Sequence, residues 1–221
     1  CSSLQNMDGL KGMTQITQLS LWDCTALQNV DVLKELRSIQ SLNVSGCTAL
    51  QNVDVLKELR SIQFLNLSGC TALQNVDVLK GLRSIQSLNL SGCTALLNLD
   101  FLKDMKQLKD LDLSECALLQ NADILEGMAE IERIALRGCS SLQNVDGLKG
   151  LTQITHLNLS DCSSLQNVDA LKELKLLVFL NLDNCSKLSP TAIAEINAIV
   201  EKNAKNSMKL FPGLERFLWP R

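Results

Sequence analysis

Aromatic residues are scarce in this sequence. They make up 3% of the 221 residues, and tyrosine is absent. The hydrophobic fraction of 46% therefore consists mostly of Leu, Ile, Val and Ala. This composition supplies enough apolar surface for a substantial core, and it predicts that the core is built from stacked aliphatic layers.

Basic stripes and long apolar runs are also lacking. The formal net charge is −3, and Lys and Arg are scattered along the chain, so we expect no nucleic-acid partner. The longest apolar run, Leu176 to Leu180, is far shorter than the roughly 20 residues that cross a bilayer. We expect no membrane span and a monomer. No signal-like segment follows Cys1, so we expect any targeting signal to lie outside this sequence.

Cysteine, in contrast, is plentiful and regular. The nine cysteines follow one another at intervals of 23 residues, with none left over. A fixed period of this length predicts a solenoid in which each repeat forms one coil. The cysteines are Cys1, Cys24, Cys47, Cys70, Cys93, Cys116, Cys139, Cys162 and Cys185.

Aliphatic residues or Met recur at the same period. When each Cys is counted as position 1, they occupy positions 4, 7, 10, 13, 16, 19 and 21, and only Ala122 is a weak member. The steps of three suit a tightly turning segment, and the final step of two suits a short strand. One coil cannot bury these side chains alone, so stability must come from stacking on neighbouring coils. In the third repeat they are Leu50, Val53, Leu56, Leu59, Ile62, Leu65 and Leu67.

The end of each repeat carries a recognisable motif. Residues 85–93 read Ile-Gln-Ser-Leu-Asn-Leu-Ser-Gly-Cys, which follows the pattern L-x-x-L-x-L-x-x-C, and eight such stretches precede the cysteines from Cys24 to Cys185. Over residues 1–188 the sequence therefore resembles the leucine-rich-repeat family. The resemblance implies an α/β solenoid with a curved parallel β-sheet on the concave face. It also implies short turns, 3-10 or helical segments on the convex face, and protein recognition through the sheet.

Several branches of this family share features with the chain. The three-residue spacing is similar to that of internalin and phosphatase-regulator repeats, which are usually slightly shorter. The cysteine, and phrases such as Leu88-Asn-Leu-Ser-Gly-Cys93, resemble repeats of plant resistance receptors and of some protozoan proteins. The subfamily stays open.

The pattern divides the chain into two parts. Residues 1–188 hold eight 23-residue repeats and the start of a ninth, and residues 189–221 form a helical cap and tail. Ser189 and Pro190 supply an N-cap and a first-turn proline, so we expect a capping helix that ends near Asn203. The apolar face of this helix would consist of Ile193, Ile196, Ile199 and Val200.

The two ends of the array differ. The first coil has no polar or helical cap, although terminal coils usually need one, so we expect the chain to be cut from a longer protein. Residues 208–221 are apolar enough to fold back on the cap, and a docking tail is the alternative. Their large apolar side chains are Leu210, Phe211, Leu214, Phe217, Leu218 and Trp219.

The cysteine ladder invites a metal or disulfide interpretation. Stacked strands are close enough for disulfides, but each repeat offers one thiol, with neither a His nor a Cys-x-x-Cys pair to complete a metal site. We instead predict buried free thiols that donate to loop carbonyls, with no metal and no cofactor. A ladder of free thiols favours a reducing, intracellular setting.

Asn and Asp form a second ladder at positions 6 and 8, from Asn6 and Asp8 to Asn167 and Asp169. Calcium binding is disfavoured because the loops lack the glycines that wrap an ion, and one Asp per coil supplies few of the oxygens that calcium needs. We predict that Asn accepts hydrogen bonds from turn amides and that Asp caps the short segment that follows.

An enzyme is not expected. His156 is the only histidine, and Ser160 does not differ from the serines at the same position of other repeats, such as Ser45 and Ser68. A catalytic triad needs a positioned base and a nucleophile distinct from its copies.

The outward-facing positions of the strands define the expected binding face. Most are small and polar, with one column reading Ser20, Asn43, Asn66, Asn89, Asp112, Ala135, Asn158 and Asn181. Aromatic and charged departures are better candidates, because such side chains anchor and orient protein partners. The candidates are Trp22, Phe64, Lys109, Asp110, Asp112, Glu115, Glu132, Arg133, Arg137, His156 and Phe179.

These observations predict a non-catalytic scaffold that binds a protein or peptide on its concave sheet. One alternative is a targeting or regulatory region of a larger enzyme or signalling protein. Another is a surface or adhesive array.

Overall fold

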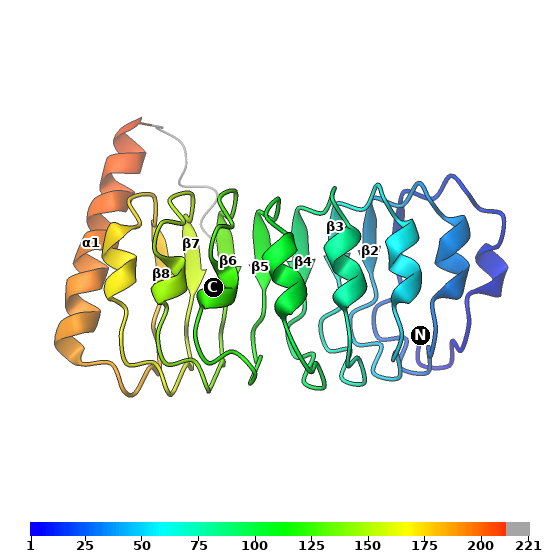
Figure 1. The fold of residues 1–221 in the computed structure, drawn as a ribbon, viewed down its shortest axis with the longest axis horizontal. Coiled ribbons are helices and arrows are strands. Elements are labelled where there is room, and N and C mark those ends of the chain that lie inside the picture. The colour runs from blue at the N-terminus through cyan, green and yellow to red at the C-terminus, as the bar shows by residue number, and fades with distance from the viewer. Residues whose placement is uncertain (211–221) are drawn as a thin grey trace.

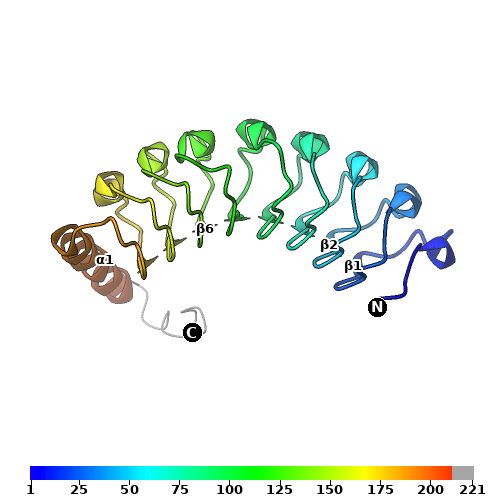
Figure 2. The same cartoon turned by 90° about the horizontal axis from the view of Figure 1, so that it is seen from below.

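The computed structural model describes residues 1–210, with side chains up to Ser207. It is an arc of coils whose C-terminal end is closed by a helix (Figures 1 and 2). Each coil contributes one short strand to the inner side of the arc and one 3-10 helix to the outer side. The strands are β1 (Gln18–Ser20), β2 (Ser41–Asn43), β3 (Phe64–Asn66), β4 (Ser87–Asn89), β5 (Asp110–Asp112), β6 (Arg133–Ala135), β7 (His156–Asn158) and β8 (Phe179–Asn181).

The eight strands form one parallel sheet in sequence order. Each strand pairs with the next at equivalent positions of the repeat, as in the pairs Leu19–Leu42 and Leu42–Leu65. The middle residue of each strand points into the core and its two neighbours face the concave side, as the alternation of a strand requires. The strands thus occupy positions 18–20, one residue earlier than the sequence predicted.

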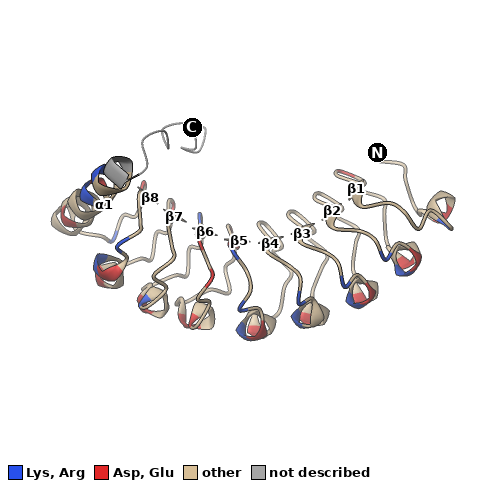
Figure 3. Ribbon diagram, turned by 90° about the horizontal axis from the view of Figure 1, so that it is seen from above, with Lys and Arg blue, Asp and Glu red and all other residues tan. Residues whose placement is uncertain are grey.

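The outer side of the arc carries eight 3-10 helices. Figure 3 shows charged residues on every one of them, whereas among the strands only β5 and β6 carry charged residues. Their short length suits 3-10 geometry, which rarely extends beyond a few residues. The bounds are η1 (Asp8–Leu10), η2 (Asp31–Glu35), η3 (Asp54–Glu58), η4 (Asp77–Gly81), η5 (Asp100–Asp104), η6 (Asp123–Leu125), η7 (Asp146–Leu148) and η8 (Asp169–Glu173).

The Asn and Asp ladders have different roles. In all eight coils the Asn side chain accepts a hydrogen bond from the backbone N–H of the Asp two residues later, at 2.7 Å for Asn52 and Asn75. The predicted role of Asn is therefore confirmed. The predicted cap by Asp is wrong, because each Asp is the first residue of its 3-10 helix. It pairs instead with the Lys three residues later in three coils, as in Asp8–Lys11 at 2.9 Å.

The core is a continuous stack of aliphatic side chains between the sheet and the 3-10 helices, running from Met7 to Val200. The first coil is the exception, because Leu4, Leu10 and Ile16 are only partly buried. These side chains have a neighbouring coil on one side only.

The cysteine thiols form a buried ladder along one edge of this core. In six coils the thiol donates a hydrogen bond to a backbone carbonyl 26 residues earlier, as from Cys70 to Val44 at 3.3 Å and from Cys185 to Leu159 at 3.0 Å. All nine cysteines are free, and only Cys1 is exposed. The predicted structural role of a buried thiol that caps a loop carbonyl is confirmed.

Helix α1 (Pro190–Leu210) closes the core at the C-terminal end. The Ser189 hydroxyl accepts the N–H of Ala192 at 3.1 Å, which confirms the predicted N-cap. Of the predicted apolar face, Ile196 and Val200 are buried and Ile193 and Ile199 pack partly against the core. The helix continues past Asn203 because no proline or glycine interrupts it before Pro212.

The expected packing of residues 208–221 falls outside the described side chains. Along residues 1–210, no helix combines the length and apolar character needed to cross a membrane.

Candidate binding site on the concave face

Five of the sequence-predicted residues line up across the sheet. The first strand positions form one row in register, in which Phe64 pairs with Ser87 and the row continues through Asp110, Arg133, His156 and Phe179. Because neighbouring parallel strands lie about 4.8 Å apart, these side chains are direct neighbours. The sheet thus brings together residues that are far apart in the sequence.

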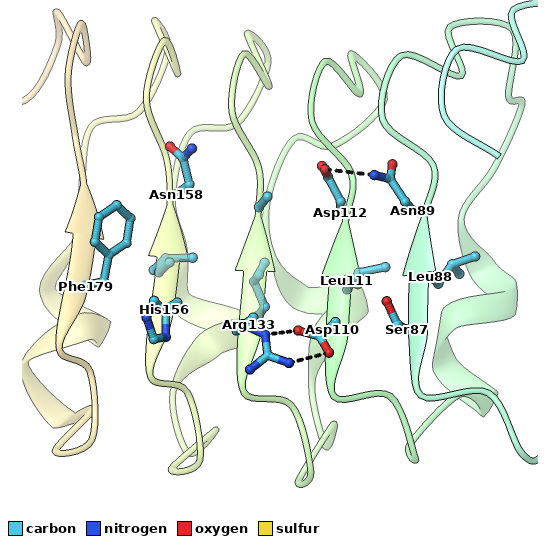
Figure 4. Close-up of a pocket in the computed structure, with 13 residues that line it drawn as sticks. Ser87, Leu88, Asn89, Asp110, Leu111, Asp112, Arg133, His156, Asn158 and Phe179 are labelled. Carbon is cyan, nitrogen blue, oxygen red and sulfur yellow. Dashed lines mark hydrogen bonds and ion pairs between the residues drawn. The ribbon is translucent and has the colours of Figure 1, made fainter. Parts of the chain in front are cut away.

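A hollow of about 350 Å³ lies over this row, between β4 and β8 (Figure 4). Its volume is at the lower end of the ~300–1,000 Å³ range of ligand pockets. We call it the concave hollow. It is lined by Ser87, Leu88, Asn89, Asp110, Leu111, Asp112, Arg133, Ile134, Ala135, His156, Leu157, Asn158 and Phe179.

Ala135 explains why the concave face is hollowed here. It occupies the third strand position, where the neighbouring strands carry Asp112 and Asn158. A methyl group between two longer side chains leaves a gap in an otherwise continuous column. The sequence shows this alanine as a break in an Asn-rich column, but we did not predict it, or Ser87, Asn89 and Asn158, as site residues.

An ion pair crosses one side of the concave hollow. The Arg133 guanidinium contacts both carboxylate oxygens of Asp110, with Nη2 to Oδ2 at 2.7 Å, and lies 3.7 Å from Glu132. The hydrogen bonds that Arg133 donates to the Asp110 carboxylate raise the pKa of Arg133. A bidentate pair of this kind fixes both side chains more firmly than a single contact does.

A stacked aromatic pair forms the other side. The rings of His156 and Phe179 lie 5.8 Å apart between centroids, with an angle of 25° between their planes. Burial lowers the pKa of His156, and the positive charge of Arg133 lowers it further. Nδ1 of His156 lies 2.9 Å from the hydroxyl of Thr155, which orients the ring. The imidazole is therefore mainly neutral at pH 7 and presents an apolar ring face.

The third strand position carries a polar network. Asp112 accepts the N–H of Ser114 at 2.9 Å, as Asn66 and Asn89 accept the N–H two residues later in their own coils. Its other oxygen accepts a hydrogen bond from the Asn89 amide at 3.3 Å. Asp112 therefore replaces an Asn without changing the turn and adds a negative charge. Two carboxylates and one guanidinium make the lining negatively charged.

The other sequence-predicted residues lie outside the concave hollow. Trp22 follows β1 at the far end of the sheet. Phe64 lies on β3, next to Ser87 at the rim of the concave hollow. Trp22 and Phe64 are both exposed. Lys109 and Glu132 come just before β5 and β6, and Glu115 and Arg137 come after them. Arg137 forms an ion pair with Asp161 at 3.0 Å.

A second apolar patch was missed by sequence reasoning. Leu97 and Leu118 are exposed on neighbouring coils, beyond the C-terminal ends of β4 and β5. Leu97 replaces a Gln, and Leu118 replaces an Ala or Ser, that the other full repeats carry at the same position. These two substitutions could have indicated the patch from the sequence. Nothing in the part of the chain that the structure describes covers these leucines.

In the described part of the chain, no group of three or more His, Cys, Asp or Glu side chains is placed to hold a metal ion. Burial raises the pKa of the Cys70, Cys139 and Cys162 thiols to about 12 and that of Cys93 to about 11. These thiols are therefore poor nucleophiles and poor metal ligands at neutral pH.

A family model matches this chain along almost its whole length. It is the BspA type leucine-rich repeat region, and its matches cover residues 1–118, 64–189 and 113–210. No curated protein matches the chain significantly in sequence.

Solved structures with the same fold include bacterial repeat proteins. Internalin C2 of Listeria monocytogenes superposes with a TM-score of 0.67 at 20% identity, over 82% of this chain and 77% of that one. The functional domain of InlJ from the same bacterium, described as including a cysteine ladder, gives 0.59 at 18% identity, over 84% of this chain and 45% of that one. The leucine-rich repeat domain of the type III effector XopL gives 0.67 at 21% identity, over 86% and 67%. At these identities the similarity shows the fold.

Proposed function

This chain belongs to the BspA-type leucine-rich repeat family, and on that premise we propose that it is a non-catalytic protein-interaction module whose concave hollow binds an extended peptide segment of a protein partner. The observation that carries this proposal is the gap at Ala135, which opens a depression between a charged wall and an aromatic wall. Repeat solenoids use extended concave surfaces of this kind for binding.

The lining indicates the chemistry of the bound segment. An apolar or aromatic side chain would pack on the stacked rings of His156 and Phe179, since aromatic surfaces dominate the energetics of interfaces. A Lys or Arg would lie near Asp112, whose charge no cation of the described chain neutralises. Polar backbone groups of the segment would meet Ser87, Asn89 and Asn158.

The test is a selection of binding peptides from a random library displayed on phage, followed by affinity measurements on single peptides. Ala135→Arg fills the concave hollow and adds a charge that repels a cationic segment. Asn43→Arg is the matched control, because it places the same side chain in the same column on β2. We expect the selected peptides to be enriched in aromatic and basic residues.

We expect Ala135→Arg to weaken their binding at least about tenfold, or about 1.4 kcal/mol, and Asn43→Arg to leave it unchanged. Equal affinities for both variants, with both folded by circular dichroism, would place the binding face elsewhere.

A further inference from the structure

Aromatic side chains are concentrated at the C-terminal end of the chain. The whole sequence has five Phe and two Trp, and Phe211, Phe217 and Trp219 lie within the eleven residues 211–221. The same segment contains Leu214, Leu218, two Arg and one Glu. It therefore combines large apolar side chains with two cationic ones, which is the chemistry that suits the lining of the concave hollow.

The capping helix leads the chain towards this hollow. Helix α1 starts at Pro190, after the C-terminal end of β8, and crosses to the opposite edge of the strand. There the Asn203 amide donates to the carbonyls of Leu174 and Leu177, at 3.0 and 3.1 Å, just before β8 begins. Figures 2 and 3 show that the C-terminal half of α1 lies towards the concave side of the arc.

The aromatic wall lies at that same edge. His156 and Phe179 are the first residues of β7 and β8, so they are near the edge that α1 reaches at Asn203. Phe179 also lines a second depression, between β8 and α1, together with Ile193 and Asn197. The surface from the capping helix to the concave hollow is therefore continuous.

The distances permit an intramolecular contact. An extended segment of eleven residues spans up to about 36 Å. The three strand spacings that separate β8 from β5 amount to about 14 Å. The exposed Leu97 and Leu118 are a less suitable target, because they lie beyond the opposite ends of the strands.

We propose that residues 211–221 of this chain occupy its own concave hollow, with aromatic side chains on the His156–Phe179 pair and an arginine near Asp112. This inference rests on the proposed function, since it assigns an internal competitor to the same site. Tethering gives the segment a high effective concentration, in the millimolar range for short flexible connections. An external peptide therefore has to displace it.

The test uses Trp219 as a reporter in the full chain. The only other tryptophan, Trp22, is exposed on the first coil, and Trp22→Phe leaves Trp219 as the single fluorophore. In this background we expect Trp219 to be shielded from acrylamide quenching. Ala135→Arg should make it accessible, with a several-fold larger quenching constant and a red-shifted emission, whereas Asn43→Arg should not.

A double variant keeps the test decisive if Ala135→Arg does not fold. His156→Ala with Phe179→Ala removes the aromatic wall and should also expose Trp219. A tryptophan that stays shielded in every folded variant packs elsewhere, for example on the cap, and one that is exposed in all of them is undocked. Either result overturns the proposal. Neither affects the phage-display test, which scores binding of external peptides.

The regulatory consequence has its own measurement. Phe217→Ser with Trp219→Ser weakens the internal competitor without touching the concave hollow, so a selected peptide should bind this variant at least about tenfold more tightly. Unchanged affinity would mean that the tail does not compete. Loss of peptide binding in both forms of the chain would count against the proposed function itself.

Discussion

Four residues other than glycine adopt the left-handed backbone conformation that favours glycine. At position 23 of the repeat, Gly46, Gly69, Gly92 and Gly138 have φ of 66–68°. The same position is held by Asp23, Glu115, Asp161 and Asn184, with φ of 53–64°. Asp and Asn tolerate this region better than other residues. Glu115 has no such tolerance, and among the described residues its carboxylate forms no ion pair.

Glu115→Gly is therefore expected to stabilise the chain. The substitution relieves the left-handed strain of about 1–2 kcal/mol and costs about 0.5–1 kcal/mol of extra chain entropy, so the net gain is roughly 0.5–1 kcal/mol. Urea denaturation measures it as a higher midpoint with the same slope. The control is Gly138→Ala, which places a side chain at the same position of the next coil and should lower the midpoint. A lower midpoint for Glu115→Gly would show that this side chain stabilises the fold.

The outer elements of the sixth and seventh coils approach each other unusually closely. A Cβ atom added to Gly147 in η7 would lie 2.2 Å from the carbonyl oxygen of Ala122 and 2.6 Å from Cα of Asp123. Both are backbone atoms, which cannot rotate away as a flexible side chain can. The alanine that was the weak member of the aliphatic pattern is thus matched by a glycine in the next coil, and the pair lets η6 and η7 pack together.

Gly147→Ala should destabilise the chain by roughly 2 kcal/mol or more, because the two backbones must separate. The matched control is Gly9→Ala. Gly9 occupies the same position in η1, within the same Asp-Gly-Leu sequence, and an added Cβ would meet nothing within 4 Å. Its substitution should be neutral or slightly stabilising. Thermal and urea unfolding of the two variants give the comparison, and equal losses would mean that the clash is not what matters.

The local sequence pattern was sufficient to predict the coils, the strands and the start of the capping helix, but not the contacts between them. The 23-residue period, the step of two before each Cys, and Ser189-Pro190 predicted the coils, the strands and the start of the capping helix. The end of that helix was missed because only a later breaker, Pro212, marks it. The role of Asp at position 8 was misassigned because capping and first-turn residues have similar preferences.

For the candidate site too, the sequence predicted the direction of single side chains but not the shape that they form together. Alternation along the strand predicted that Asp110, Arg133, His156 and Phe179 face the concave side, and the sheet register makes them neighbours. The hollow itself was not predictable from the residues that stand out. It exists because Ala135 is shorter than the side chains beside it, and depth is a property of neighbouring coils rather than of one position.

At the scale of the whole molecule, the stacked coils form one structure held together by contacts between neighbours. The buried thiols run through this stack and join coil to coil through their hydrogen bonds to carbonyls. Every coil depends on its neighbours for burial. A change that acts on the thiols together therefore acts on the whole array.

High pH is such a change. The pKa of Cys70, Cys139 and Cys162 rises from an ordinary value of 9.0 to about 12 in the folded chain, because burial disfavours the thiolate. Below pH 9 the folded and unfolded chains both keep these protons, so stability is complete. Between about pH 9 and 12 the unfolded chain releases protons that the folded chain retains. The free energy of unfolding should then fall by up to about 1.4 kcal/mol per pH unit for each thiol.

Urea midpoints at pH 7.5 and 10.5, under reducing conditions, measure this loss. The control is the triple variant Cys70→Ser, Cys139→Ser and Cys162→Ser. Each serine hydroxyl can still donate to the carbonyl but does not titrate in this range. Whatever its stability at pH 7.5, this variant should lose less stability at pH 10.5 than the original chain. An equal loss in both would assign the effect to the lysines, and the thiol ladder would then contribute packing without making the fold sensitive to base.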